Sequence, residues 1–243
     1  MVFCRSVKGG SAMHIHGLQK LTLLDYPGHT ACTVFTGGCN YRCPFCHNAS
    51  LVLHPTEQPL IAPEEVLSFL KKRQGLLDGV CITGGEPTLE KGLGDFCAAV
   101  KDLGFALKLD SNGSRPEVLR ELIDKKLVDY IAMDIKSSRE NYGALVGFPG
   151  YDTAPVEESA ALLMEGRVDF EFRTTVVKEF HSAEDFERIG QWLRGGEKYF
   201  LQCFKDSGDI LGSGCSAFGK DEMEHLREAV LPYIPNTHLR GVD

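Results

Sequence analysis

Short apolar segments alternate with segments of helical periodicity along most of the 243-residue chain, and this alternation constrains the fold most. Strands joined by helical crossovers form parallel sheets with helices outside them. Six units are too few to close an eight-stranded barrel, so the predicted fold class is α/β, an open partial (βα)6 barrel. The strands are predicted at 31–36, 79–83, 105–110, 128–134, 170–177 and 199–204, and the helices at 63–74, 93–103, 116–126, 155–164, 182–193 and 220–233.

The length and the pattern favour a single domain over residues 1–243. Residues 1–12 are polar and precede the patterned sequence, so we predict a disordered extension there, with Met13 as an alternative start. Residues 205–243 are predicted to form a C-terminal loop, rich in glycine and serine, and a helix.

The charge balance excludes several classes of partner. The formal net charge is -8 and the sequence pI is about 5.5, without the basic patches of a nucleic-acid-binding protein. No stretch approaches the roughly 20 apolar residues that span a membrane. An apolar signal-peptide core is also missing, which predicts a cytoplasmic protein whose nine cysteines are thiols or metal ligands rather than disulfides.

Three of these cysteines, Cys39, Cys43 and Cys46, lie in one loop directly after the first predicted strand, with the spacing C-x3-C-x2-C. Soft thiolates select zinc, copper(I) or iron–sulfur clusters. A 4Fe–4S cluster usually takes four cysteines, so three would leave one iron open to a small-molecule ligand. The alternative is a structural zinc site in which a histidine, such as His54, completes four ligands.

The loop resembles the signature of the radical S-adenosylmethionine (SAM) superfamily, including the aromatic Phe45 before the last cysteine. Its Cys-His-Asn ending is similar to that of activating enzymes for glycyl-radical enzymes. The flanking segments 24–28 (LDYPG) and 49–52 (ASLV) resemble one subgroup, the anaerobic ribonucleoside-triphosphate reductase activating proteins. The resemblance implies a partial barrel of the radical SAM type that binds one three-cysteine 4Fe–4S cluster and SAM, with Phe45 against the adenine.

A second motif, Thr83-Gly84-Gly85-Glu86-Pro87, ends the second predicted strand. Glycines allow close backbone approach to a ligand, although such a segment also forms ordinary turns. The resemblance implies that Gly84, Gly85 and Glu86 contribute to binding the amino group of SAM.

Charged residues mark the ends of the later predicted strands. Asp110 begins an Asp-Ser-Asn-Gly segment, which is also a good turn sequence. Asp134 and Lys136 follow the fourth strand and have the alternative of a simple ion pair. By resemblance, Asp110 contacts the methionine group of SAM, Asp134 and Lys136 face its carboxylate, and the two aspartates hold a monovalent cation. Arg173 lies inside an apolar strand and needs a partner there, either the SAM carboxylate or a core carboxylate.

All these groups follow the carboxyl ends of predicted parallel strands, which lie at one edge of a sheet. The sequence therefore predicts one active site at this edge. The resemblance implies reductive cleavage of SAM to a 5′-deoxyadenosyl radical that removes hydrogen from a glycine of a partner enzyme. Anaerobic ribonucleoside-triphosphate reductase is the expected partner, and flavodoxin or ferredoxin the expected electron donor.

Other functions remain open at this point. Many pyruvate formate-lyase activating enzymes carry a histidine where this chain has Gln202, yet such an activity stays an alternative, as does a small-molecule radical SAM enzyme. A non-enzymatic iron–sulfur or zinc module is the third.

The cysteines and histidines outside the motifs have simpler expected roles. Cys32, Cys81 and Cys97 are expected to be small buried side chains, and Cys203 and Cys215 could share a metal. His181 and His225 are expected at the surface.

Overall fold

Eight strands form one sheet in the computed structural model, which describes residues 13–242. Their order in the sheet follows the sequence, so β1 and β8 are its two edges. β1 pairs with β2 in antiparallel orientation, and every later pair is parallel. The strands are β1 (Ile15–Thr22), β2 (Ala31–Thr36), β3 (Gly79–Gly84), β4 (Ala106–Ser111), β5 (Tyr130–Asp134), β6 (Asp169–Val176), β7 (Tyr199–Cys203) and β8 (Thr237–Arg240).

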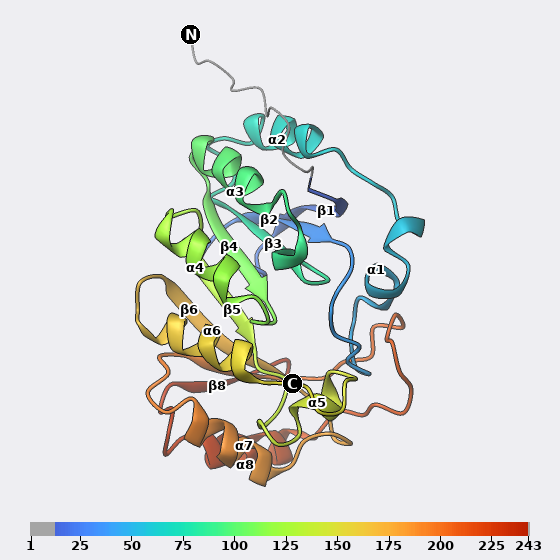
Figure 1. Cartoon of the computed structure of the whole chain (residues 1–243), viewed down its shortest axis with the longest axis vertical. Helices are drawn as coiled ribbons and strands as arrows, with labels where there is room; N and C mark the ends of the chain where they lie inside the picture. Colours follow the sequence, from blue (N-terminus) through green and yellow to red (C-terminus); the bar gives the residue numbers. More distant parts are fainter. Residues whose placement is uncertain (1–12, 243) are drawn as a thin grey trace.

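Most helices connect the parallel strands and lie along the outer side of the curved sheet (Figure 1). Proline opens α2 and α4, where its missing N–H is not needed. Ser182 caps α7 through the backbone N–H of Asp185 at 3.2 Å. The helices are α1 (Ala49–Leu53), α2 (Pro63–Lys71), α3 (Leu93–Asp102), α4 (Pro116–Asp124), α5 (Tyr142–Leu145), α6 (Ala154–Met164), α7 (Ala183–Trp192) and α8 (Lys220–Val230), with 3-10 turns η1 (Pro55–Glu57) and η2 (Pro87–Leu89).

The predicted α/β fold class is confirmed, because β2 to β7 are the six predicted strands and form an open, parallel arrangement. Several predicted ends shift by a few residues. The helix predicted at 63–74 ends at Lys71, where Lys72 and Arg73 donate to carbonyls three residues back and tighten the turn.

Two strands at the sheet edges escape the sequence pattern. β1 exposes residues 19–21 and pairs with β2 through two register irregularities, so it lacks the apolar alternation of a half-buried strand. β8 has only four residues, which pair with residues 199–202 of β7. The C-terminal region predicted as a loop and a helix therefore also contains a strand.

The parallel strands bring their carboxyl ends to one edge of the sheet, which opens towards α1 and the loop 205–219 (Figure 1). The strand interiors are buried on both sides, as parallel sheets require. Polar groups gather at the strand ends instead, and these ends define the place of the site. Within residues 13–242, none of the helices has the length and apolar character that crossing a membrane would need.

Candidate active site

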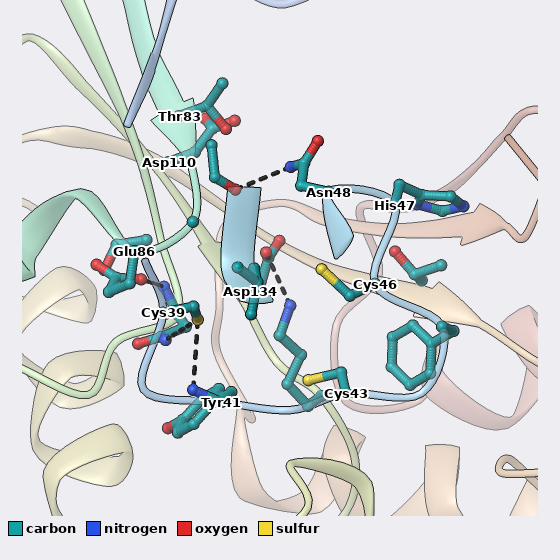
Figure 2. A pocket seen from close by; sticks show the side chains of 18 of the residues that line it. Cys39, Tyr41, Cys43, Cys46, His47, Asn48, Thr83, Glu86, Asp110 and Asp134 are labelled. Atoms are coloured by element: carbon teal, nitrogen blue, oxygen red, sulfur yellow. Dashed lines mark hydrogen bonds and ion pairs between the residues drawn. The ribbon is translucent and has the colours of Figure 1, made fainter. Parts of the chain in front are cut away.

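A cavity of about 270 Å³ lies at the carboxyl ends of strands β2 to β7. Figure 2 shows the three cysteines of the loop after β2 around this space, together with Asp110, Asp134 and Glu86 from neighbouring strands. The structure thus brings all the residues that the sequence predicts for the site into one cavity. They are Cys39, Cys43, Phe45, Cys46, Gly84, Gly85, Glu86, Asp110, Asp134, Lys136 and Arg173.

The segment of residues 37–48, here called the cysteine loop, is fixed at both ends. The backbone N–H of Gly38 donates to the carbonyl of Leu51 at 2.8 Å. At the other end, Nδ2 of Asn48 donates to the carbonyl of Gly84 at 2.8 Å (Figure 2). The end of β3 and the first turn of α1 therefore hold the loop over the cavity.

The thiols of the cysteine loop are buried or half-buried, and burial favours their neutral, protonated form. Cys43 is 6% exposed, and Cys39 and Cys46 are half-buried. Burial raises the pKa of Cys43 to about 12 against the opposing effect of Lys136, and it raises the pKa of Cys39 to about 11. These two thiols are therefore protonated at neutral pH, and a metal that binds them must displace the protons.

The donor set fits a cluster better than a single zinc ion. In residues 13–242, no three His, Cys, Asp or Glu side chains converge on one metal position. His54 has a side chain 58% exposed and faces Glu57 at 3.4 Å, while Nε2 of His47 contacts the carbonyl of Lys205 at 2.7 Å. A closed four-ligand zinc site does not form from these groups. A 4Fe–4S cluster takes one thiolate per iron, so ligands spread around a cavity suit it.

The two glycines at the end of β3 allow the cysteine loop to cross β3 closely. Gly84 has a φ of +117°, and a Cβ there would lie 2.3 Å from the carbonyl oxygen of Thr36. A Cβ on Gly85 would lie 1.8 Å from the carbonyl oxygen of Gly38. The backbone N–H groups of Gly85 and Glu86 donate to Thr36 and Gly38 at 3.0 and 2.9 Å. Glycine at position 84 is thus explained by backbone contact with the last residue of β2, and glycine at position 85 by backbone contact with the cysteine loop.

Glu86 is 1% exposed, and the protein itself occupies its carboxylate. Oε1 accepts from Oγ1 of Thr88 at 2.5 Å and from Oγ of Ser111 at 2.9 Å, and Oε2 accepts from the backbone N–H of Asn112 at 2.7 Å. Burial raises the pKa of Glu86, while these hydrogen bonds oppose the rise. Through these hydrogen bonds Glu86, which follows β3, connects the end of β3 to the end of β4.

A network of charges forms one wall of the cavity. Arg173 on β6 contacts Oδ2 of Asp110 at 3.0 Å and Oδ1 of Asp134 at 2.5 Å. Lys108 contacts Asp110, and Lys136 contacts Asp134 at 3.0 Å. Burial alone would raise the pKa of both carboxyls, but Arg173 and the two lysines hold them below the ordinary value. The sequence left two partners open for Arg173, and the structure shows core carboxylates.

The cavity lining contains two cations of this network, Lys136 and Arg173, and its two carboxylates, Asp110 and Asp134, whereas Lys108 lies outside the lining. A monovalent cation between Asp110 and Asp134 would meet Arg173, which already bridges them. The cation implied by the resemblance stays a prediction that the position of Arg173 disfavours. The N–H donors of Lys136 and Arg173 suit an anionic group, such as a carboxylate.

Phe45 lines the cavity but is only 3% exposed, because it packs against Phe180 and His181 with ring centroids 6.0 and 6.2 Å away. The expectation that His181 lies at the surface is wrong. It is 5% exposed, its Nδ1 accepts from the backbone N–H of Val177 at 3.1 Å, and its Nε2 contacts the carbonyl of Lys136 at 2.9 Å. His225, with a side chain 74% exposed, lies at the surface as expected.

Further residues of the cavity were not selected from the sequence. Asn48 and Asn112 fix the cysteine loop, and Thr175 lies beside Gln202 in the register of β6 and β7. Asn48 belongs to the Cys-His-Asn ending of the cysteine loop, and Asn112 belongs to the Asp-Ser-Asn-Gly segment that begins at Asp110. Both therefore lie within segments that the sequence had marked as part of the site. Their hydrogen bonds depend on tertiary contacts that a single sequence does not display.

The remaining cysteines follow the expectation in part. Cys32, Cys81 and Cys97 have no exposed surface and pack in the interior, as predicted. Cys203 directs its sulfur towards the carbonyls of Phe204 and Phe218, at 3.7 and 3.6 Å. A metal shared by Cys203 and Cys215 has no support among the groups of the described residues that could hold one.

The fold is a parallel α/β sheet, and its carboxyl edge carries a three-thiol loop beside the ion pairs of Arg173, a site suited to an iron–sulfur cluster. The model of the radical SAM superfamily matches residues 33–193, and the chain belongs to this superfamily. It is a radical SAM enzyme, and this family implies a 4Fe–4S cluster and SAM as cofactors.

Two named proteins are similar to this chain in sequence. A protein of Methanocaldococcus jannaschii named "Putative glycyl-radical enzyme activating enzyme" is 30% identical over 94% of this chain and 96% of its own length. The pyruvate formate-lyase-activating enzyme of Clostridium pasteurianum is 32% identical over 50% of this chain and 52% of its own.

Among solved structures, Streptococcus suis SuiB superposes with a TM-score of 0.69 at 14% identity over 87% of this chain. The chain spans about half the length of SuiB, 49%, so this likeness concerns the fold of one part of that protein.

Proposed function

We propose that this radical SAM enzyme generates a glycyl radical on a partner enzyme, and that the partner is an anaerobic ribonucleoside-triphosphate reductase. The observation that carries the proposal is the meeting of three thiols with the cations Lys136 and Arg173 in one cavity. The name of the Methanocaldococcus relative supports the reaction, since that match spans almost all of both chains. The choice of partner is supported by the segments 24–28 and 49–52.

Cys39, Cys43 and Cys46 hold the 4Fe–4S cluster in this proposal, one thiolate to each of three irons. When bound, the cluster supplies the electron that cleaves SAM into methionine and a 5′-deoxyadenosyl radical. The protein orients SAM for this step. Lys136 and Arg173 are the cations that line the cavity, and they are proposed to bind the carboxylate of SAM.

The other predicted residues act through position. Asp110 and Asp134 fix Arg173 and Lys136 and are proposed to face the methionine portion of SAM. The backbone of Gly84 and Gly85 borders the cavity and is proposed to meet the amino group, with Glu86 holding this backbone in place. Phe45 is proposed to contact the adenine.

The reaction is tested by anaerobic reconstitution with iron and sulfide, reduction, and addition of SAM. We expect 5′-deoxyadenosine and methionine from the natural chain. Cys43→Ala is expected to lose both the cluster absorbance and the products, because one iron loses its ligand. Cys97→Ala is the matched control, since Cys97 is equally buried but lies on α3 away from the cavity. A fully loaded natural enzyme that forms no 5′-deoxyadenosine would overturn the proposal.

The partner is tested by mixing the loaded enzyme with candidate glycyl-radical enzymes under reduction by flavodoxin or ferredoxin. The expected result is a glycyl-radical resonance, by electron paramagnetic resonance (EPR), on the ribonucleotide reductase. A radical on pyruvate formate-lyase alone would reassign the partner while keeping the reaction.

A further inference from the structure

The amide of Asn112, in the turn after β4, is completely used by hydrogen bonds. Its Oδ1 accepts from the backbone N–H of Ser114 at 2.9 Å, and its Nδ2 donates to Oδ1 of Asn40 at 2.9 Å. The second proton of Nδ2 is directed at Sγ of Cys39, 3.8 Å away. The backbone N–H of Ser114 can only donate, so the atom of the amide that faces it must be Oδ1. The orientation of the amide is therefore fixed, and Nδ2 must face the sulfur of Cys39.

Asn112 is itself held firmly. It is 5% exposed, and its backbone N–H donates to Oε2 of the buried Glu86 at 2.7 Å. The carbonyl of the next residue, Gly113, accepts a hydrogen bond from Oγ of Ser159 on α6 at 2.7 Å. The side chain is thus positioned by β3 and α6 rather than by the cysteine loop alone.

The three thiols receive unequal numbers of donors. Sγ of Cys39 accepts from Nδ2 of Asn112 and also from the backbone N–H of Tyr41 at 3.4 Å (the Tyr41 contact is drawn in Figure 2). From the described part of the chain, neither Cys43 nor Cys46 receives a hydrogen bond at sulfur. A metal-bound thiolate is a stronger acceptor than a thiol, so both donors strengthen on loading.

We propose that Asn112 is a positioning residue for Cys39 and that its N–H donor raises the reduction potential of the cluster bound there. The inference rests on the proposed function of the cysteine loop. The reduced cluster carries one more negative charge, shared with its sulfurs, so a donor stabilises the reduced form more than the oxidised form. Asn112 thereby favours electron uptake by the site.

The test compares cluster potentials, measured by an EPR-monitored redox titration of the reconstituted full chain without SAM. Asn112→Leu removes the donor at similar volume, and Asn112→Asp keeps the acceptor for Ser114 while adding negative charge. Each is expected to shift the redox equilibrium about tenfold or more towards the oxidised form, which is about 59 mV for one electron. Asn112→Asp is expected to give the larger shift.

Ser159→Ala is the matched control, because it loosens the same turn from α6 but leaves both donors to Cys39. Its potential is expected to equal that of the natural chain. Equal potentials in the natural chain and both Asn112 variants would overturn the inference, as would an equal shift in Ser159→Ala. If the natural chain assembles no cluster at all, the proposed function fails and the inference falls with it.

Discussion

Replacing Gly85 by alanine tests whether the glycines after β3 serve the crossing of the cysteine loop. A Cβ at this position would lie 1.8 Å from the carbonyl oxygen and 2.6 Å from the carbonyl carbon of Gly38. Ordinary contacts begin at about 3.4 Å, so the two backbones must separate by roughly 1.6 Å. The obstacle is backbone, which cannot rotate away as a side-chain end could.

The expected loss of stability follows from two terms. Overpacking of a well-filled site typically costs about 1–3 kcal/mol. The separation also breaks the hydrogen bond from the N–H of Glu86 to Gly38, now 2.9 Å, which contributes about 1 kcal/mol. We therefore expect Gly85→Ala to lower the free energy of unfolding by about 3 kcal/mol. Iron content after reconstitution is also expected to fall, because the first cysteine lies next to Gly38.

The assay is urea unfolding of the cluster-free chain under anaerobic, reducing conditions. Gly94→Ala is the matched control, because Gly94 lies in α3 and a Cβ there meets nothing within 4 Å. That substitution is expected to raise stability by about 0.5–1 kcal/mol through the unfolded chain and helix propensity. Our reasoning would be refuted if Gly85→Ala unfolded at the same urea concentration as the natural chain and bound iron normally.

Three further outcomes are expected. Arg173→Met should lower the free energy of unfolding by about 3 kcal/mol, since it leaves buried carboxylates less neutralised; an unchanged urea midpoint would contradict this. Burial lowers the pKa of His181, so its unfolded form binds a proton first and stability should fall as the pH drops below about 6.5. His181→Gln should flatten this pH dependence, as unfolding at several pH values will show. Asp209→Ala should speed proteolysis within 205–219, because it removes the carboxylate that accepts from Oγ of Ser50 at 2.6 Å; equal cleavage rates would count against this link.

The sequence predicted the parts of this fold that are buried on both sides. Strands β2 to β7 are mostly buried and rich in apolar residues, so they can be recognised without knowledge of their neighbours. β1 and β8 form the edges, where one side is open and the apolar pattern fades. Edge strands take their conformation from pairing, and pairing is a long-range property.

The site shows the same division. Its residues could be chosen because chemically distinctive groups follow strand ends, and these ends meet at one edge in a parallel sheet. The contacts that these residues make with one another could not be predicted from the sequence. The partner of Arg173 depends on the register that sets it opposite Asp134, and the inward position of His181 depends on how the loop after β6 folds back.

The two fixed ends of the cysteine loop have a consequence for its conformational entropy. Gly38 and Asn48, near the two ends of the loop, are joined to Leu51 and Gly84 by hydrogen bonds of the protein alone. These hydrogen bonds hold the loop without the thiols, so the entropy of ordering its ends is lost in the fold itself. In small zinc domains, by contrast, metal binding and folding are one event. The ends of the cysteine loop are thus restrained by contacts with α1 and β3 that involve none of the three thiols.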